Sequence, residues 1–160
     1  MTGEFASTVY AGGTTLASQG SLDVVVAKYT TNGDPLWATM CGGSGLDRGI
    51  ALALSPDGSV VVVGQFMATA QFGTDQVISL GGTQDVFVMK MDADDGTVQW
   101  VQQGGSAAGV DQPKGVSVIA DGAIAVTGEF RGAATFSMGT INSMPDLDTA
   151  EPSVDIFIAA

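Results

Sequence analysis

One short run of residues occurs twice in this chain and begins a third time, and this internal repeat limits the possible folds more than any single residue does. The run Asp23–Tyr29, DVVVAKY, returns as Asp85–Met91, DVFVMKM, and starts again at Asp155. Self-similarity at an interval of a few tens of residues is typical of architectures in which one unit cannot bury its apolar faces alone. We therefore expect similar units that stack on one another.

The central copy of the repeat has the pattern of two β-hairpins. In each hairpin two short apolar runs flank an Asp-Gly pair, Asp57-Gly58 in the first and Asp95-Gly96 in the second. Asp and Asn before Gly favour tight hairpin turns, because these residues tolerate positive φ. No apolar period of 3.6 residues extends over a useful length, so the expected class is all-β. The expected strands are 50–54, 60–66, 86–91 and 98–102.

The expected strands are apolar on both faces, which indicates stacked sheets. Val60–Val63 is a continuous apolar run, whereas a sheet with one face in water would alternate apolar and polar residues. Four-stranded antiparallel sheets stacked around a ring, the blades of a β-propeller, bury both faces in this way. The predicted fold is therefore a partial β-propeller built from four-stranded antiparallel blades.

The repeat divides the chain into three units. Residues 1–43 have the pattern of a partial blade that lacks its first strand, residues 49–105 that of a complete blade, and residues 114–160 that of a partial blade that lacks its last strand. Because the chain begins and ends inside a repeat, we expect it to be a fragment of a longer protein. Open blade edges would then favour docking onto the rest of the parent propeller or self-association into an oligomer.

The connection from Phe66 to Asp85 is long and contains recurring aromatic residues. We expect it to add a short β segment or a loop packed on its blade. Filling the core between neighbouring units is the favoured role of its aromatic residues, and a ligand platform is the alternative. Trp37 and Trp100 each follow a turn glycine by four residues, a spacing that indicates packing between blades. The recurring aromatic residues are Phe66 and Phe72, Phe130 and Phe136, and, one residue closer together, Phe5 and Tyr10.

The charge of the chain excludes two classes of partner. The chain has 17 acidic and 5 basic residues, no histidine and a formal net charge of -12. Affinity for nucleic acid depends on Lys and Arg that displace counterions from phosphates, so neither nucleic acid nor an anionic membrane surface is an expected partner. The acidic surplus favours solubility and protects sheet edges. No apolar run approaches the length of a transmembrane helix, so membrane insertion is not expected.

The sequence assigns no catalytic, cofactor-binding or metal-ligating residue. Without histidine there is no ordinary Ser-His-Asp or Cys-His nucleophile, and the single cysteine, Cys41, is expected to be a partly buried, inert thiol. Catalysis would have to use carboxylates, lysine or tyrosine. We expect the protein not to be an enzyme, and the alternative is a carboxylate-based, glycan-active enzyme on the same scaffold.

Calcium is the ion that the acidic surplus could bind, because calcium prefers oxygen ligands. The turn around Asp92 and Asp94 is one candidate, but its acids lack the spacing of a calcium loop, and a plain hairpin turn is favoured. A solvated loop is likewise the favoured interpretation of a second acidic stretch. The acids of that stretch are Asp146, Asp148, Glu151 and Asp155.

Two aspartates recur in the glycine-rich links between the expected blades. Asp47 lies in the link after the first unit, and Asp111 lies in the link after the second. Aspartate side chains in turns commonly accept hydrogen bonds from nearby backbone N–H groups. We expect this structural role for both residues.

Taken in order, the repeated segments resemble a known bacterial repeat. The segments are Asp23–Lys28, Asn32-Gly33, Leu36-Trp37, Gly42–Gly49 and Asp57–Gly64. They are similar to the β-propeller repeat often called the SBBP repeat, which occurs in large secreted and surface bacterial proteins. The resemblance implies a noncatalytic extracellular or cell-surface scaffold that binds a protein or a glycan or assembles with itself. A rival resemblance, of the single segment Met91–Trp100 to the tryptophan motif of quinoprotein propellers, would imply an oxidoreductase on the same fold.

Overall fold

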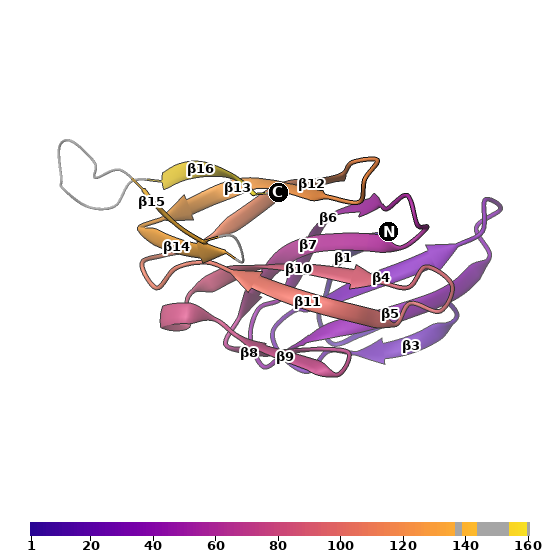
Figure 1. Ribbon diagram of the computed structural model, residues 1–160. Helices are drawn as coiled ribbons and strands as arrows, with labels where there is room; N and C mark the ends of the chain where they lie inside the picture. The colour runs from indigo at the N-terminus through magenta and orange to yellow at the C-terminus, as the bar shows by residue number, and fades with distance from the viewer. Residues whose placement is uncertain (137–138, 144–153, 160) are drawn as a thin grey trace.

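The computed structural model describes residues 1–136 and 139–143 and the backbone of residues 154–159. Most of its strands form three antiparallel sheets that follow one another in chain order, here called the first, middle and third sheets (Figure 1). The first sheet contains β1 (Thr2–Phe5), β4 (Asp23–Tyr29) and β5 (Pro35–Gly43), and the strands β8 (Thr69–Phe72) and β9 (Asp75–Ile78) of the following unit continue it in the order β1-β4-β5-β8-β9. The middle sheet contains β6 (Arg48–Leu54), β7 (Val60–Met67), β10 (Gln84–Met91) and β11 (Val98–Gly104). The third sheet contains β12 (Gln112–Val118), β13 (Ile124–Arg131) and β16 (Val154–Ala159).

The sheets are stacked, and the stacking requires small residues where strands cross. β12 lies against β6 and β7, and β6 lies against β1 and β4. At Gly49 in β6, an added Cβ would collide with the hydroxyl of Thr2 and lie 3.2 Å from the carbonyl oxygen of Gly3.

The predicted all-β class is confirmed. In the described part of the chain the helical structure is a three-residue 3₁₀ turn, η1 (Leu80–Gly82), and no helix there is long and apolar enough to cross a membrane.

The middle sheet has the strand order that the two-hairpin pattern predicts. Its order is β11-β10-β7-β6, so each strand pairs with its sequence neighbour in an antiparallel ladder. The observed strands contain the four predicted ones and extend each by at most two residues at either end. Gly58 and Gly96 adopt φ of 87° and 76° in the two turns, the conformation that made Asp-Gly a hairpin signal.

A small hairpin is inserted between the second and third strands of every unit, as the long connection suggested. The three hairpins are β2–β3 (Thr8–Ala11, Thr14–Ala17), β8–β9 (Thr69–Phe72, Asp75–Ile78) and β14–β15 (Ala133–Phe136, Gly139–Asn142). The sequence did not indicate that two of them reach back to the preceding sheet. Gly42 and Gly43 at the end of β5 pair with β8 of the next unit, and Gly105 pairs with Thr135 of β14 in the same way.

The ladder between the second and third strands has one register in all three units. Phe5 stands opposite Asp23, Phe66 opposite Asp85, and Phe130 opposite Asp155. The sequence repeat is therefore a structural repeat, since the same residue types occupy the same ladder positions.

The core lies between the sheets and under the inserted hairpins. All of Val60–Val63 is buried, which confirms burial on both faces of β7. Phe66 and Phe72 meet edge to face with ring centroids 6.4 Å apart, and Phe87 stands 4.7 Å from Phe72. Phe66 and Phe72 therefore fill space in the core, as predicted for the recurring aromatic residues, and Phe87 of β10 packs with them.

The predicted core role is wrong for Tyr10, which is 71% exposed. Ser7 and Ala68 share a positive φ at the start of the two hairpins, so Thr8–Ala11 and Thr69–Phe72 are equivalent strands of equal length. Ala11, which is buried, therefore occupies the place of Phe72, and Tyr10 points outward. The two aromatic residues of the first unit are one residue closer together than those of the other units. Because adjacent residues of a strand face opposite sides, Tyr10 lies on the outer face of its strand and not on the predicted core face.

The turn Asp92–Gly96 of the middle sheet is docked on the first sheet. The Nζ of Lys28 and the Nε1 of Trp37 both donate to the carbonyl oxygen of Ala93, at 2.7 and 3.1 Å. Thr39 donates its hydroxyl to the carbonyl oxygen of Gly96 at 2.7 Å. The predicted packing role is thus confirmed for Trp37, whereas Trp100 makes no such hydrogen bond within the described residues.

Substitution of Trp37 should weaken this docking. We expect Trp37→Phe to lower the free energy of unfolding by about 1 kcal/mol more than Trp100→Phe, because only the first change removes a hydrogen bond between sheets. Urea denaturation followed by circular dichroism measures both variants. Equal losses in the two variants would contradict the proposed role of the Trp37 hydrogen bond.

Candidate functional site

Each link between sheets is held by one aspartate that bridges two backbone segments. Asp47 accepts hydrogen bonds from the N–H of Gly43 in its own link, at 2.8 Å, and from the N–H of Met67 at the end of β7, at 3.1 Å. Asp111 accepts from the N–H of Ser106, at 2.7 Å, and from that of Arg131 at the end of β13, at 3.2 Å. The predicted hydrogen bonds to backbone N–H groups are therefore confirmed for both residues.

A second aspartate stands at the start of the third strand of the unit before each link. Asp23 Oδ2 accepts from the N–H of Gln19 at 2.6 Å, and Asp85 Oδ2 accepts from the N–H of Leu80 at 2.7 Å. The Oδ1 atoms of Asp23 and Asp85 are both buried without a hydrogen-bond partner in the described residues. Both side chains belong to the repeated run, but sequence reasoning did not connect them with Asp47 and Asp111.

The two aspartates of each link meet at a glycine and form what we call a junction pair. A Cβ added to Gly42 would collide with Asp23 Oδ1 and lie 2.8 Å from Asp47 Oδ2. A Cβ added to Gly105 would lie 2.6 Å from Asp85 Oδ1 and 2.9 Å from Asp111 Oδ2. Both aspartates and the glycine that lies between them in the sequence recur in the next unit. This recurrence is the sequence signal that could have revealed the junction pair.

Burial controls the ionisation of the junction pairs. It raises the pKa of Asp47 to about 6, and the charge of Asp23 adds to the effect. Burial also raises the pKa of Asp85 to about 7, with a further contribution from Asp111. The pKa of Asp111 is raised by burial as well, against the hydrogen bonds that it accepts. All four residues are fully buried, so a substrate could not touch these carboxyl groups.

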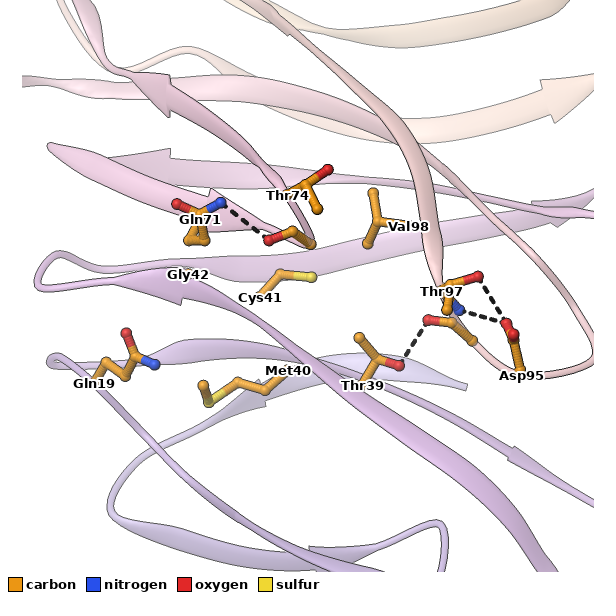
Figure 2. Close-up of a pocket in the computed structure, with 12 residues that line it drawn as sticks. Gln19, Thr39, Met40, Cys41, Gly42, Gln71, Thr74, Asp95, Thr97 and Val98 are labelled. Atoms are coloured by element: carbon orange, nitrogen blue, oxygen red, sulfur yellow. Dashed lines mark hydrogen bonds between the residues drawn. The ribbon is translucent and has the colours of Figure 1, made fainter.

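A separate cavity of about 370 Å³, here called the rim cavity, opens between β5, the β8–β9 hairpin and the turn before β11 (Figure 2). Its polar side chains are Gln19, Thr39, Gln71, Thr74, Asp95 and Thr97. Figure 2 shows that internal hydrogen bonds hold several of them: Gln71 donates to the carbonyl oxygen of Gly73, and Asp95 accepts from Thr97. Gln19 is exposed, and its side-chain amide makes no hydrogen bond within the described residues. It is therefore available to a ligand.

Cys41 and Asp95 differ in their availability for chemistry. Cys41 lines the rim cavity but is 1% exposed, and burial raises the pKa of its thiol to about 12. The thiol is therefore neutral and unreactive, as expected, although more deeply buried than predicted. Asp95 lies at the surface, and the hydrogen bonds from Thr97 lower its pKa, so it contributes a negative charge to the cavity.

The turn that was a candidate calcium site is organised as a hairpin turn. Asp92 Oδ1 accepts from the N–H of Asp94 at 2.8 Å, and the carbonyl groups of Ala93 and Gly96 are bonded to the first sheet. In the described residues no three Asp, Glu, Cys or His side chains converge as metal ligands. The other candidates, Asp146, Asp148 and Glu151, lie outside the described residues.

Comparison with protein-family models and with curated proteins finds no match to this chain.

The close approach at the junction glycines predicts a large cost for a single methyl group. We expect Gly105→Ala to lower the free energy of unfolding by about 1–3 kcal/mol, because the added Cβ presses on the carboxyl group of Asp85. Gly3→Ala is the control, since nothing lies within 4 Å of a Cβ at that position. Chemical denaturation measures both, and a cost in Gly105→Ala no larger than in Gly3→Ala would contradict the described junction.

Proposed function

We propose that this chain is a noncatalytic β-propeller-type repeat scaffold, of the extracellular or cell-surface kind, that binds other polypeptides through open strand edges. The stacked antiparallel sheets, the constant register of the repeat and the resemblance to SBBP segments support the proposal. The observation that carries it is the unpaired edge of β1 in the first sheet.

The open edge of β1 is identified by comparison with β7. Both strands hold the same register to their third strand, with Phe5 opposite Asp23 and Phe66 opposite Asp85. The other edge of β7 pairs with β6, where Gly49 stands opposite Gly64. In the described part of the chain, β1 pairs with β4 alone, and β16 pairs with β13 alone. Such edges accept an added strand from another chain.

The backbone donors at this edge follow from the ladder. Met1 and Ala27 exchange both hydrogen bonds, the N–H of each donating to the carbonyl oxygen of the other. Hydrogen-bonded and non-hydrogen-bonded positions alternate in an antiparallel pair. The N–H groups of Thr2 and Glu4 therefore point away from β4, toward a strand that would be added.

The burial of the junction pairs supports a noncatalytic function over the carboxylate-based alternative. A glycan-active enzyme of that kind needs two carboxyl groups in contact with the sugar. The four junction aspartates are fully buried, and Asp57 and Asp95, which are exposed, accept hydrogen bonds from neighbours in their own turns. Carboxyl groups held in this way serve architecture better than acid–base chemistry.

A proline at the open edge should abolish association. We expect the wild-type chain to show a weight-average mass that rises above 16.1 kDa with concentration, and Glu4→Pro to remain monomeric because it removes an outward N–H without touching the ladder to β4. Glu4→Gln keeps that N–H and, like Glu4→Pro, loses the ion pair between Glu4 and Arg48, so it should associate as the wild type does. Light scattering measures the mass, and a wild-type chain that is monomeric at all concentrations would refute the proposal.

A bound glycan would lie in the rim cavity, where amide, hydroxyl and carboxylate groups can pair with sugar hydroxyls. We expect Gln19→Ala to reduce binding to glycans on a printed array by roughly fivefold, the effect of one lost hydrogen bond. Gln76→Ala, which removes an exposed amide outside the cavity, is the control. Glycan binding that both variants retain would exclude the rim cavity, and glycan cleavage would favour the enzyme instead.

A further inference from the structure

The junction pairs bring together carboxyl groups that their surroundings cannot keep doubly ionised. Two like charges in a buried site repel each other, and one of them is neutralised by a proton where no cation is present. We propose that each junction pair retains one proton in mildly acidic solution, and that loss of this proton toward and above neutral pH loosens the contact between neighbouring sheets. This inference does not depend on the proposed function.

The hydrogen bonds at the first junction leave a place for that proton. Backbone N–H groups reach both oxygens of Asp47 and the Oδ2 of Asp23. Among the described residues nothing donates to Asp23 Oδ1, and a Cβ added to Gly42 would press on both this oxygen and Asp47 Oδ2. A proton held between these two carboxyl oxygens gives Asp23 Oδ1 the donor that it lacks. The same proton removes the like-charge repulsion.

The second junction repeats this arrangement with different neighbours. Leu80 donates to Asp85 Oδ2, and Ser106 and Arg131 donate to Asp111 through their backbone N–H groups. Asp85 Oδ1 is again left without a partner in the described residues, beside the glycine that also contacts Asp111 Oδ2. The equivalent aspartate Oδ1 atom lacks a hydrogen-bond partner in both described copies, so this unsatisfied acceptor is a regular feature of the junction.

The charged groups around the first junction are engaged elsewhere. Arg48 follows Asp47 in β6, but its Nε lies 3.4 Å from Glu4 of β1. The thiol of Cys41 in β5 is neutral at physiological pH. Neither group supplies a positive charge to Asp23 and Asp47.

The second junction is flanked by β12 and β13, which carry three charged side chains. Lys114 of β12 lies 3.5 Å from Glu129 of β13. Arg131 approaches the junction through its backbone N–H, while its side chain runs along Gly109, where an added Cβ would lie 2.9 Å from its Cδ. Of these three residues, Arg131 therefore supplies the junction with a hydrogen bond, and it does so through its backbone N–H.

A proton fits the junction better than a metal ion does. Calcium requires six to eight oxygen ligands, whereas each junction brings two carboxylate oxygens to one glycine, and the groups that donate to these carboxyl groups are backbone N–H groups and the hydroxyl of Ser106. In the part of the chain that is described, no third acidic side chain joins either pair.

The direction of the pH effect follows from proton linkage. The folded pKa of Asp47, about 6, and that of Asp85, about 7, lie above the ordinary carboxyl value of 3.8. Between these values the native state binds more protons than the unfolded state, so stability falls as the pH rises. The loss of stability increases as the pH approaches 7, and it levels off above the folded pKa values of Asp47 and Asp85. The lowered pKa values of Asp57 and Asp95 act only in more acidic solution, because both groups are ionised above pH 5 in either state.

The test is the pH dependence of unfolding, measured with wild-type protein at concentrations where light scattering shows a monomer, so that association does not contribute. We expect the folding equilibrium constant to fall at least about tenfold from pH 5 to pH 8, the effect of one raised pKa unit. Asp85→Asn should reduce this dependence to the part that the first junction contributes, because its amide can donate to Asp111 at any pH. Asp57→Asn, which neutralises an exposed carboxylate, should leave it unchanged. Amide hydrogen exchange should show lower protection of Ser106 and Arg131 at pH 8.

The remaining outcomes each decide the proposal. A pH dependence that is flat in the wild-type protein, or that is as large in Asp85→Asn as in the wild type, would overturn it. Stabilisation of the parent protein at pH 8 by calcium chloride, absent in Asp85→Asn, would replace the proton by a cation and also overturn it. If Asp85→Asn does not fold, infrared spectra of the parent protein decide: a protonated carboxyl band that disappears between pH 5 and pH 8 supports the proposal, and its absence at pH 5 refutes it.

Discussion

The hydrogen bonds that Asp47 and Asp111 accept from two separate backbone segments are the interaction on which the arrangement of the sheets depends. Each aspartate joins its own link to the end of the second strand in the following sheet. Because Asp23 or Asp85 is drawn to the same glycine, three consecutive elements meet at one point. Two of the inserted hairpins, β8–β9 and β14–β15, reinforce these contacts, since they pair with the sheet that precedes them.

Local features of the fold were predictable from the sequence, and long-range pairings were not. The strands and turns of the middle sheet follow from apolar runs and Asp-Gly pairs, which act within a few residues. The pairing of Asp85 with Asp111 depends on how a link returns to the start of β10, so it required the topology. Tyr10 shows a further limit, because spacing alone did not reveal that Ala11 is the buried residue of its hairpin.

The residues that recur in the repeat and the residues that are available to a ligand lie in different parts of the molecule. Residues that the repeat preserves, such as Asp23, Asp85 and Gly105, lie in the interior and are occupied with holding the sheets together. The side chains that are free for a ligand, such as Gln19, lie at the rim cavity, where the sequence signal was weakest. Repeat architectures commonly combine a constant interior with variable edges and loops.

The central claim is that the junctions make the sheets one cooperative body. Native-state hydrogen exchange tests it most directly, through the opening free energies of buried amides in β4, β7 and β13. The account predicts one shared value for Val26, Val62 and Val126, which lie in the cores of the three sheets. A first sheet that opens at a much lower free energy than the middle sheet would contradict it.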